Sequence, residues 1–191
     1  MASSGTLVRS ARLSERLTQT QLADRSGIDQ ARISRSEQGR EVEFGTVDRL
    51  LAATGHRLYL APTRRDDAAS AASDIRVRLR AGDTDRALRA LLVLNDNLVA
   101  EHGLVRGVLG LAEPEPTGSP VWDAAIAALV EWRLSEESVP LPSWVGAPGR
   151  FLAKPRVLEI DPADPEPSAT DVPDAFARHG VLAWRDTFAS V

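Results

Sequence analysis

The segment from Leu17 to Arg40, LTQTQLADRSGIDQARISRSEQGR, carries the side chains of this sequence that are best suited to binding chemistry. Glutamine and arginine can hydrogen-bond to phosphates and to the edges of bases. Ala23 lies four residues before Gly27 and ten before Ile33, a spacing that suits two helices packed closely across a tight turn. Gly27 can adopt the positive φ of such a turn, and Asp29 can cap the second helix. This pattern is typical of a helix-turn-helix unit that reads DNA.

Catalytic and metal-binding constellations are missing from the sequence. The three histidines, His56, His102 and His179, are scattered, and none lies beside a serine nucleophile or at a spacing typical of metal ligands. The glycines within 103–110 lack the Lys-Ser/Thr ending of a phosphate-binding loop. The sequence has no cysteine, which excludes disulfides and thiolate metal sites. We therefore expect a protein that is not an enzyme and that uses no metal and no cofactor.

Charge is divided unevenly along the chain. Residues 1–65 contain 11 Arg and 7 acidic residues, a net charge of +4, whereas residues 66–191 contain 12 basic and 20 acidic residues, a net charge of −8. This division suits a DNA-binding domain joined to a domain of another function. The N-terminus has no apolar signal core, and no apolar run reaches the ~20 residues needed to cross a bilayer. The sequence predicts a bacterial cytoplasmic protein without membrane contact, associated with the nucleoid when it binds DNA.

Residues 1–63 are predicted to form a helical DNA-binding domain that ends in a short strand. Four helices are expected, over residues 6–16, 19–26, 30–38 and from 44 to just before Gly55. The segment 56–62, HRLYLAP, alternates apolar with other side chains, which is typical of a strand ended by proline. Because a helical domain offers no sheet, this strand either pairs with its copy in a second subunit or is an extended linker.

Residues 64–74 are predicted to be a linker or the polar first turn of a helix, and residues 75–191 a second, acidic, partner-binding domain. Four helices are expected there, over residues 75–80, 84–102, 103–111 and 121–137. Proline-rich loops are expected over 113–120 and 161–174, and the apolar residues after 172 should pack back on the helices. The predicted fold class is therefore mainly α, with an irregular, proline-rich C-terminal part.

Four tryptophans lie in this second part of the chain. Trp122 and Trp132 share a helix with other apolar residues and are expected in the core. Trp144 and Trp184 lie in less regular segments. Because aromatic side chains are enriched at the centres of interfaces, these two are candidate anchors for a partner protein.

The motif at 17–40 also resembles a known family. It is similar to the helix-turn-helix of Cro and the phage repressors, also called the xenobiotic-response-element class. The resemblance covers about a third of the chain and is carried by several positions in register. These are the Leu-Thr-Gln start, Gln21-Leu22-Ala23, Gly27-Ile28, Gln30, Ile33 and Glu37-x-Gly39.

The resemblance implies roles for individual residues. Four positions face the major groove, namely Gln30, Ala31, Arg32 and Arg35. There a glutamine can pair with adenine, an arginine with guanine, and the alanine methyl can contact thymine. Gln19, at the start of the second helix, and Arg40, just past the third, are the implied phosphate contacts.

Two further positions concern the structure of the domain. Arg12 matches an arginine that pairs with the glutamate at the position of Glu37 in such repressors, so this ion pair is assigned to structure and not to DNA. Ser36 stands where the family commonly has a large apolar residue. Packing beneath the third helix is therefore expected to be thinner, or to be filled from Phe44.

The sequence thus predicts a transcriptional repressor that binds a palindromic operator in double-stranded DNA as a homodimer. The C-terminal pattern PSWVGAPGRFLAKP, then PDAFARHGVLAW, resembles bacterial antitoxins that join this helix-turn-helix to a toxin-neutralising region. That resemblance implies an antitoxin that represses its own operon and covers a basic toxin surface with its acidic domain. The alternative is a stand-alone transcription factor whose helical domain binds a small-molecule effector or only oligomerises.

Overall fold

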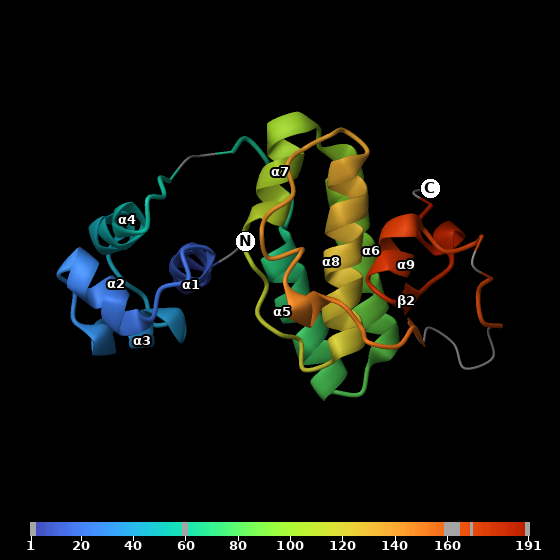
Figure 1. Cartoon of the computed structure of the whole chain (residues 1–191), viewed down its shortest axis with the longest axis horizontal. Coiled ribbons are helices and arrows are strands. Elements are labelled where there is room, and N and C mark those ends of the chain that lie inside the picture. The colour runs from blue at the N-terminus through green and yellow to red at the C-terminus, as the bar shows by residue number, and fades with distance from the viewer. Residues whose placement is uncertain (1–2, 59–60, 159–164, 169, 190–191) are drawn as a thin grey trace.

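The computed structural model describes residues 3–58, 61–158, 165–168 and 170–189 (Figure 1). An N-terminal helical region contains α1 (Ser4–Ser14), α2 (Gln19–Ser26), α3 (Gln30–Glu37) and α4 (Phe44–Ala53). A second region contains α5 (Ala68–Arg80), α6 (Thr84–Ala100), α7 (Gly103–Leu111), α8 (Pro120–Ser135), α9 (Asp174–Arg178), the 3-10 helices η1 (Pro148–Arg150) and η2 (Arg185–Phe188), and the strands β1 (Arg156–Val157) and β2 (Val181–Leu182). The prediction of a mainly α fold is confirmed.

Local signals in the sequence set the ends of α2 and α3. The Thr18 hydroxyl accepts a hydrogen bond from the Gln21 amide, and the Gln21 side chain accepts one from the Thr18 amide, which forms a capping box. α2 ends at Gly27, whose φ of 67° is the left-handed conformation that glycine adopts without strain. The Asp29 carboxylate then accepts from the first free amides of α3. The turn between α2 and α3 is therefore built as predicted.

α1 crosses α3 at very short range where Gly5 meets Ser36. Ser36 is only 1% exposed, and a Cβ added at Gly5 would lie 2.1 Å from the Ser36 carbonyl oxygen. Phe44, in contrast, is 74% exposed, so the expectation that it fills the space beneath α3 is wrong. The small residue at 36 is matched by a second small residue on α1, and the backbones close the gap.

The strand predicted over 56–62 is not seen in the described residues 56–58 and 61–62, while Tyr59 and Leu60 lie outside the described residues. This connection leads from α4 across to the second region (Figure 1), where the Thr63 hydroxyl donates to Glu101 at 2.7 Å. The segment 64–74 predicted as a linker is helical from Ala68 onward. The Asp67 carboxylate caps that helix by accepting from the Ser70 amide at 2.8 Å.

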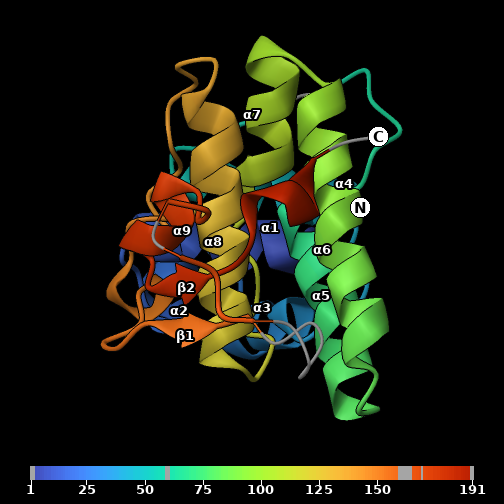
Figure 2. The same ribbon diagram turned by 90° about the vertical axis from the view of Figure 1, so that its right-hand side faces the viewer.

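α8 forms the centre of the second region, where it contacts α5, α6, α7 and α9 (Figure 2). Residues 122–130 of α8 are all buried, including Trp122, as expected for that tryptophan. Four alanines among these nine residues leave room for neighbouring helices on several sides, which explains why α8 is buried on more than one face. None of the described helices is long and apolar enough to span a membrane.

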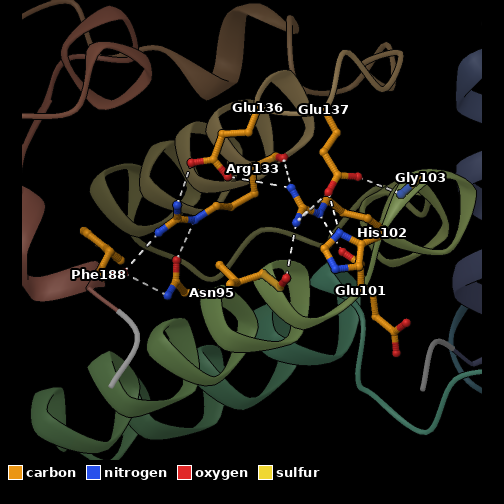
Figure 3. A network of polar contacts seen from close by, with 10 residues as sticks. Asn95, Glu101, His102, Gly103, Arg133, Glu136, Glu137 and Phe188 are labelled. Carbon is orange, nitrogen blue, oxygen red and sulfur yellow. Dashed lines mark hydrogen bonds and ion pairs between the residues drawn. The ribbon is translucent and has the colours of Figure 1, made fainter.

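The C-terminal residues pack back on these helices, as predicted. β1 and β2 pair in parallel, with Arg156 opposite Val181, and the rings of Phe176 and Phe188 lie edge-on to Trp132 at 6.2 and 6.1 Å. Figure 3 shows how polar groups fix this end of the chain. The Arg133 guanidinium donates to the Phe188 carbonyl at 3.0 Å and to the Asn95 side chain at 2.8 Å, so α6, α8 and the terminal segment share one buried network.

The contact between α1 and α3 predicts a strong effect of one methyl group. Replacing Gly5→Ala should lower the free energy of unfolding by about 1–3 kcal/mol or more, because the new Cβ meets a backbone carbonyl that cannot rotate away. The usual gain of about 1 kcal/mol from glycine to alanine in a helix is too small to compensate.

Gly45→Ala, in α4, is the matched control, because its added Cβ would have no neighbour within 4 Å. Urea unfolding followed by circular dichroism should show this variant to be at least as stable as the wild type. Equal stability of the Gly5→Ala variant would contradict the close approach of α1 and α3.

Candidate nucleic-acid interface

The four residues predicted to face DNA bases are all exposed on α3, whereas Ile33 and Ser36 face inward. They divide into two groups. Arg35 lies four residues after Ala31, so these two share a face of the helix, and Gln30 precedes them at its first residue. Arg32 points toward α4, where its guanidinium donates to the Thr46 hydroxyl at 3.2 Å. Arg35 therefore lies between Ala31 and Arg32 on the exposed side of α3, and Arg32 forms the edge of this side toward α4.

A chain of hydrogen bonds connects α1 to this face. Arg12 forms a two-pronged ion pair with Glu37, with Nε to Oε1 at 2.7 Å and Nη2 to Oε2 at 2.8 Å. The Gln19 amide nitrogen also donates to Glu37 at 2.9 Å, and the Gln19 oxygen accepts from the Gln30 amide at 2.9 Å. The third arm of Arg12 donates to the Leu17 carbonyl at 2.7 Å. The conformation of Gln30 is thus set by groups that reach back into the helical core.

Gln19 has a role that sequence reasoning did not assign. It was predicted to contact phosphate, and in the structure its side chain bridges Glu37 to Gln30. The Gln19–Gln30 spacing of 11 residues is no local signal, because only the packing of α2 against α3 brings the two side chains together. A phosphate contact by Gln19 stays a prediction.

Hydrogen bonding decides the charge of Glu37. Burial alone would raise the pKa of its carboxyl group, since the side chain is 5% exposed. The hydrogen bonds from Arg12 and Gln19 and the charge of Arg12 outweigh this effect and hold the pKa of Glu37 below its usual 4.5. The carboxylate is therefore ionised at neutral pH and holds Arg12 and Gln19 in place.

Positive charge gathers at the end of α3. Arg32, Arg35 and Arg40 line a hollow of about 400 Å³ together with residues 41–43. The backbone at Arg40 folds back on α3, where its amide donates to the Arg35 carbonyl at 3.0 Å. Three guanidinium groups around one hollow suit a phosphate group, and Glu41 and Glu43 at its rim limit the net charge.

A second opening, the interdomain cleft, separates the N-terminal region from α5. It has a volume of about 570 Å³, and its walls carry hydroxyl, amide, guanidinium and carboxylate groups. Ser34 and Gln38 of α3 line one wall, and Ser73 and Arg76 of α5 line the other. One hydrogen bond that spans the two regions joins the Glu113 amide to the Ser10 hydroxyl at 2.9 Å.

The candidate partner anchors lie at different depths. Trp144 is 5% exposed, and its indole N–H donates to the Gly110 carbonyl at 3.0 Å. The Trp144 ring therefore belongs to the core, and its role as an anchor for a partner stays a prediction. Trp184 is half-buried, with its N–H 3.3 Å from the Pro165 carbonyl, and its contact with a partner stays a prediction.

The histidines lie apart from one another. His179 is fully buried between the Arg150 carbonyl and Glu131, at 2.7 Å from each, while His102 is exposed beside Glu137. Within the part of the chain that the structure describes, no three His, Asp or Glu side chains are grouped so that they could hold a metal ion.

Residues 5–56, about a quarter of the chain, match the helix-turn-helix domain family. No curated protein and no solved structure matches the chain at the significance required. A helix-turn-helix domain implies DNA binding, and this chain therefore carries a DNA-binding domain of the kind found in transcriptional regulators. α2 and α3 are the helix pair of that domain, and α1 and α4 support it.

The Arg12–Glu37 pair predicts a large loss of stability when the carboxylate is removed. Glu37→Gln should lower the free energy of unfolding by about 3 kcal/mol, because the buried Arg12 loses its counter-charge. Glu43→Gln is the control, since the Glu43 side chain makes no cap hydrogen bond at the start of α4, and its effect should stay within about 0.5 kcal/mol. Urea titrations of both variants measure this difference, and equal losses would contradict it.

The same pair predicts a pH dependence. Because folding lowers the pKa of Glu37, its stabilisation is present above the unfolded value of 4.5 and is lost as pH falls through the lower folded value. The stability difference between the wild type and Glu37→Gln should therefore shrink between about pH 5 and about pH 3. A difference that stays constant over this range would mean that the carboxylate charge does not contribute.

Proposed function

We propose that this protein is a sequence-specific transcriptional repressor that reads its operator with α3. The observation that carries the proposal is the ordered polar face of α3 within a matched helix-turn-helix domain. Gln30 is held by Gln19 before DNA arrives, so less side-chain freedom is lost on binding. The remaining hydrogen-bonding groups of Gln30 can meet an adenine, and Arg35, five residues further along α3, can meet a guanine.

Phosphate contacts complete the proposed interface. Arg40 follows α3 directly and lines the same hollow as Arg32 and Arg35, which supports contact with the backbone beside the bases that α3 reads. Arg32 lies at the edge of the reading face, near Thr46, and is the residue that can serve either a base or a phosphate. Ala31 offers only a methyl group, which suits the methyl of thymine.

A homodimer on a palindromic operator is part of the proposal. One recognition helix reads only a few base pairs, and two copies related by a twofold axis read two half-sites about one helical turn, ~34 Å, apart. The strands β1 and β2 pair with each other within the second region of one chain. We therefore do not propose this sheet as the dimer interface.

The negative charge of the second region favours a protein partner with a basic surface. Residues 66–191 carry a net charge of −8, which favours such a partner over another acidic protein. We therefore propose an antitoxin that represses its own operon and neutralises a toxin through this region. A stand-alone regulator, whose helical region binds an effector or oligomerises, is the alternative.

Two arginine substitutions test how the DNA is read. After an operator is selected from random duplexes with the full-length protein, Arg35→Ala should lose about 1–3 kcal/mol of discrimination at one base position. Arg40→Ala should instead weaken binding to all sequences alike and reduce the salt dependence. Fluorescence anisotropy at several salt concentrations measures both effects. Full-length protein that binds no duplex in a salt-dependent way would overturn the proposal.

The product of the neighbouring gene tests the antitoxin. If that product arrests growth, co-expression of this chain should restore growth, and the two proteins should purify as one complex that represses the shared promoter. A neighbouring product that is harmless, or that does not bind this chain, would remove the antitoxin proposal and leave the stand-alone regulator.

A further inference from the structure

α5 turns a polar face toward the DNA-reading side of the N-terminal region. Ala69, Ser73 and Arg76 all line the interdomain cleft and are spaced four and three residues apart, so they follow one side of the helix. Arg80 comes four residues after Arg76 and extends that side by one further turn, at the last residue of α5. The face of α5 that looks at the N-terminal region therefore ends in two arginines.

The opposite wall of the cleft belongs to the DNA-reading unit itself. Gln19, Ser34 and Gln38 line it, and Gln19 is the residue that holds Gln30. In Figures 1 and 2, α3 lies at the level of the half of α5 that leads to the α5–α6 turn, on the other side of the interdomain cleft. DNA seated on the exposed face of α3 would consequently run past the arginine end of α5.

The end of α5 and the start of α6 form a helical hairpin whose net charge is opposite in sign to that of the second region. Residues 76–89 contain five arginines and two aspartates, a net charge of +3, within a region whose net charge is −8. Asp83 pairs with Arg86 at 3.2 Å, and Glu115 pairs with Arg76 at 2.5 Å. Among the described residues, Arg80 has no acidic partner within ion-pair distance.

The ion pair of Arg76 does not prevent a phosphate contact. Both side chains are partly exposed, at 26% for Arg76 and 36% for Glu115, and exposed pairs contribute little to stability. A guanidinium group binds phosphate as readily as carboxylate, in the same two-pronged geometry. A phosphate of bound DNA can therefore share or replace Glu115 as the partner of Arg76.

We propose that Arg76 and Arg80 form a second DNA-contact surface, which binds the phosphodiester backbone beside the half-site that α3 reads. The inference rests on the proposed function, because it requires DNA on α3. The contact carries no sequence information, since guanidinium groups meet phosphates that every sequence shares. It extends the footprint beyond the helix-turn-helix and places the helical region against the flanking duplex.

The test compares two duplexes that contain the same selected operator. One duplex ends at the operator, and the other extends it by about 10 base pairs on each side, one turn of DNA. Full-length wild type should bind the extended duplex more tightly, with a steeper dependence of log K on log salt. Arg76→Ala with Arg80→Ala should lower affinity for the extended duplex by about tenfold or more and reduce the salt slope by up to about 2.

Three comparisons make the result specific. The double variant should bind the short duplex like the wild type and keep its sequence preference. Arg80→Ala alone, which leaves the Arg76–Glu115 pair intact, should show about half of the change in slope. Lys154→Ala with Arg156→Ala removes two exposed cations from the C-terminal segment. This control variant should bind both duplexes with the affinity and salt slope of the wild type.

Wild type with the same affinity and salt slope on both duplexes would overturn the inference and leave the proposed function standing. An equal loss on both duplexes by the double variant would also overturn it, because the arginines would then act within the core operator or through the fold. If the wild type binds neither duplex, the proposed function itself fails.

Discussion

A buried carboxylate on α3 sets the arrangement of the whole N-terminal region. The Glu37 side chain is almost withdrawn from water, so its two oxygens must be satisfied by the protein. Arg12 supplies a two-pronged contact from α1, and Gln19 supplies a third hydrogen bond from α2. One charge thereby fixes the three helices relative to one another, and a shift of any of them would leave it short of a partner.

The need to satisfy the buried Glu37 carboxylate also fixes a side chain at the surface, through the amide of Gln19. Once its N–H groups are turned toward Glu37, its oxygen must face the other way, where it accepts from Gln30. The orientation of a surface side chain therefore follows from a charge in the interior. This coupling explains how a short helix can present a defined hydrogen-bonding pattern, since its outermost glutamine is held by the scaffold and not by its own rotamer preference.

The sequence predicted those parts of the structure that depend on neighbours in the chain. Thr18, Gly27 and Asp29 form hydrogen bonds with residues only two to four positions away, so the turn and its caps could be predicted from the sequence. The contact of Gly5 with Ser36 could not be predicted, because the need for a small residue there depends on a backbone segment that is distant in the sequence. The Gln19–Gln30 hydrogen bond has the same origin, since it depends on the angle at which two helices cross.

Features of the second region that depend on tertiary contacts could not be predicted from the local pattern. Trp144 lies among prolines and glycines, yet it is buried because its indole N–H finds the Gly110 carbonyl. β1 and β2 have two residues each and show no alternation that a sequence could reveal. The spacing of the arginines on α5 could be seen in the sequence, but the position of α5 across the interdomain cleft from α3 could not.

The hydrogen bonds from Arg133 and Asn95 to the Phe188 carbonyl have a consequence for synthesis of the chain. The domain that reads DNA is complete once the first 56 residues have left the ribosome, whereas the network of α6 and α8 must wait for residue 188. At about 5–20 residues per second this delay is on the order of 10 seconds. During each round of translation, the whole helix-turn-helix segment is therefore synthesised before the residue that completes the network of α6 and α8.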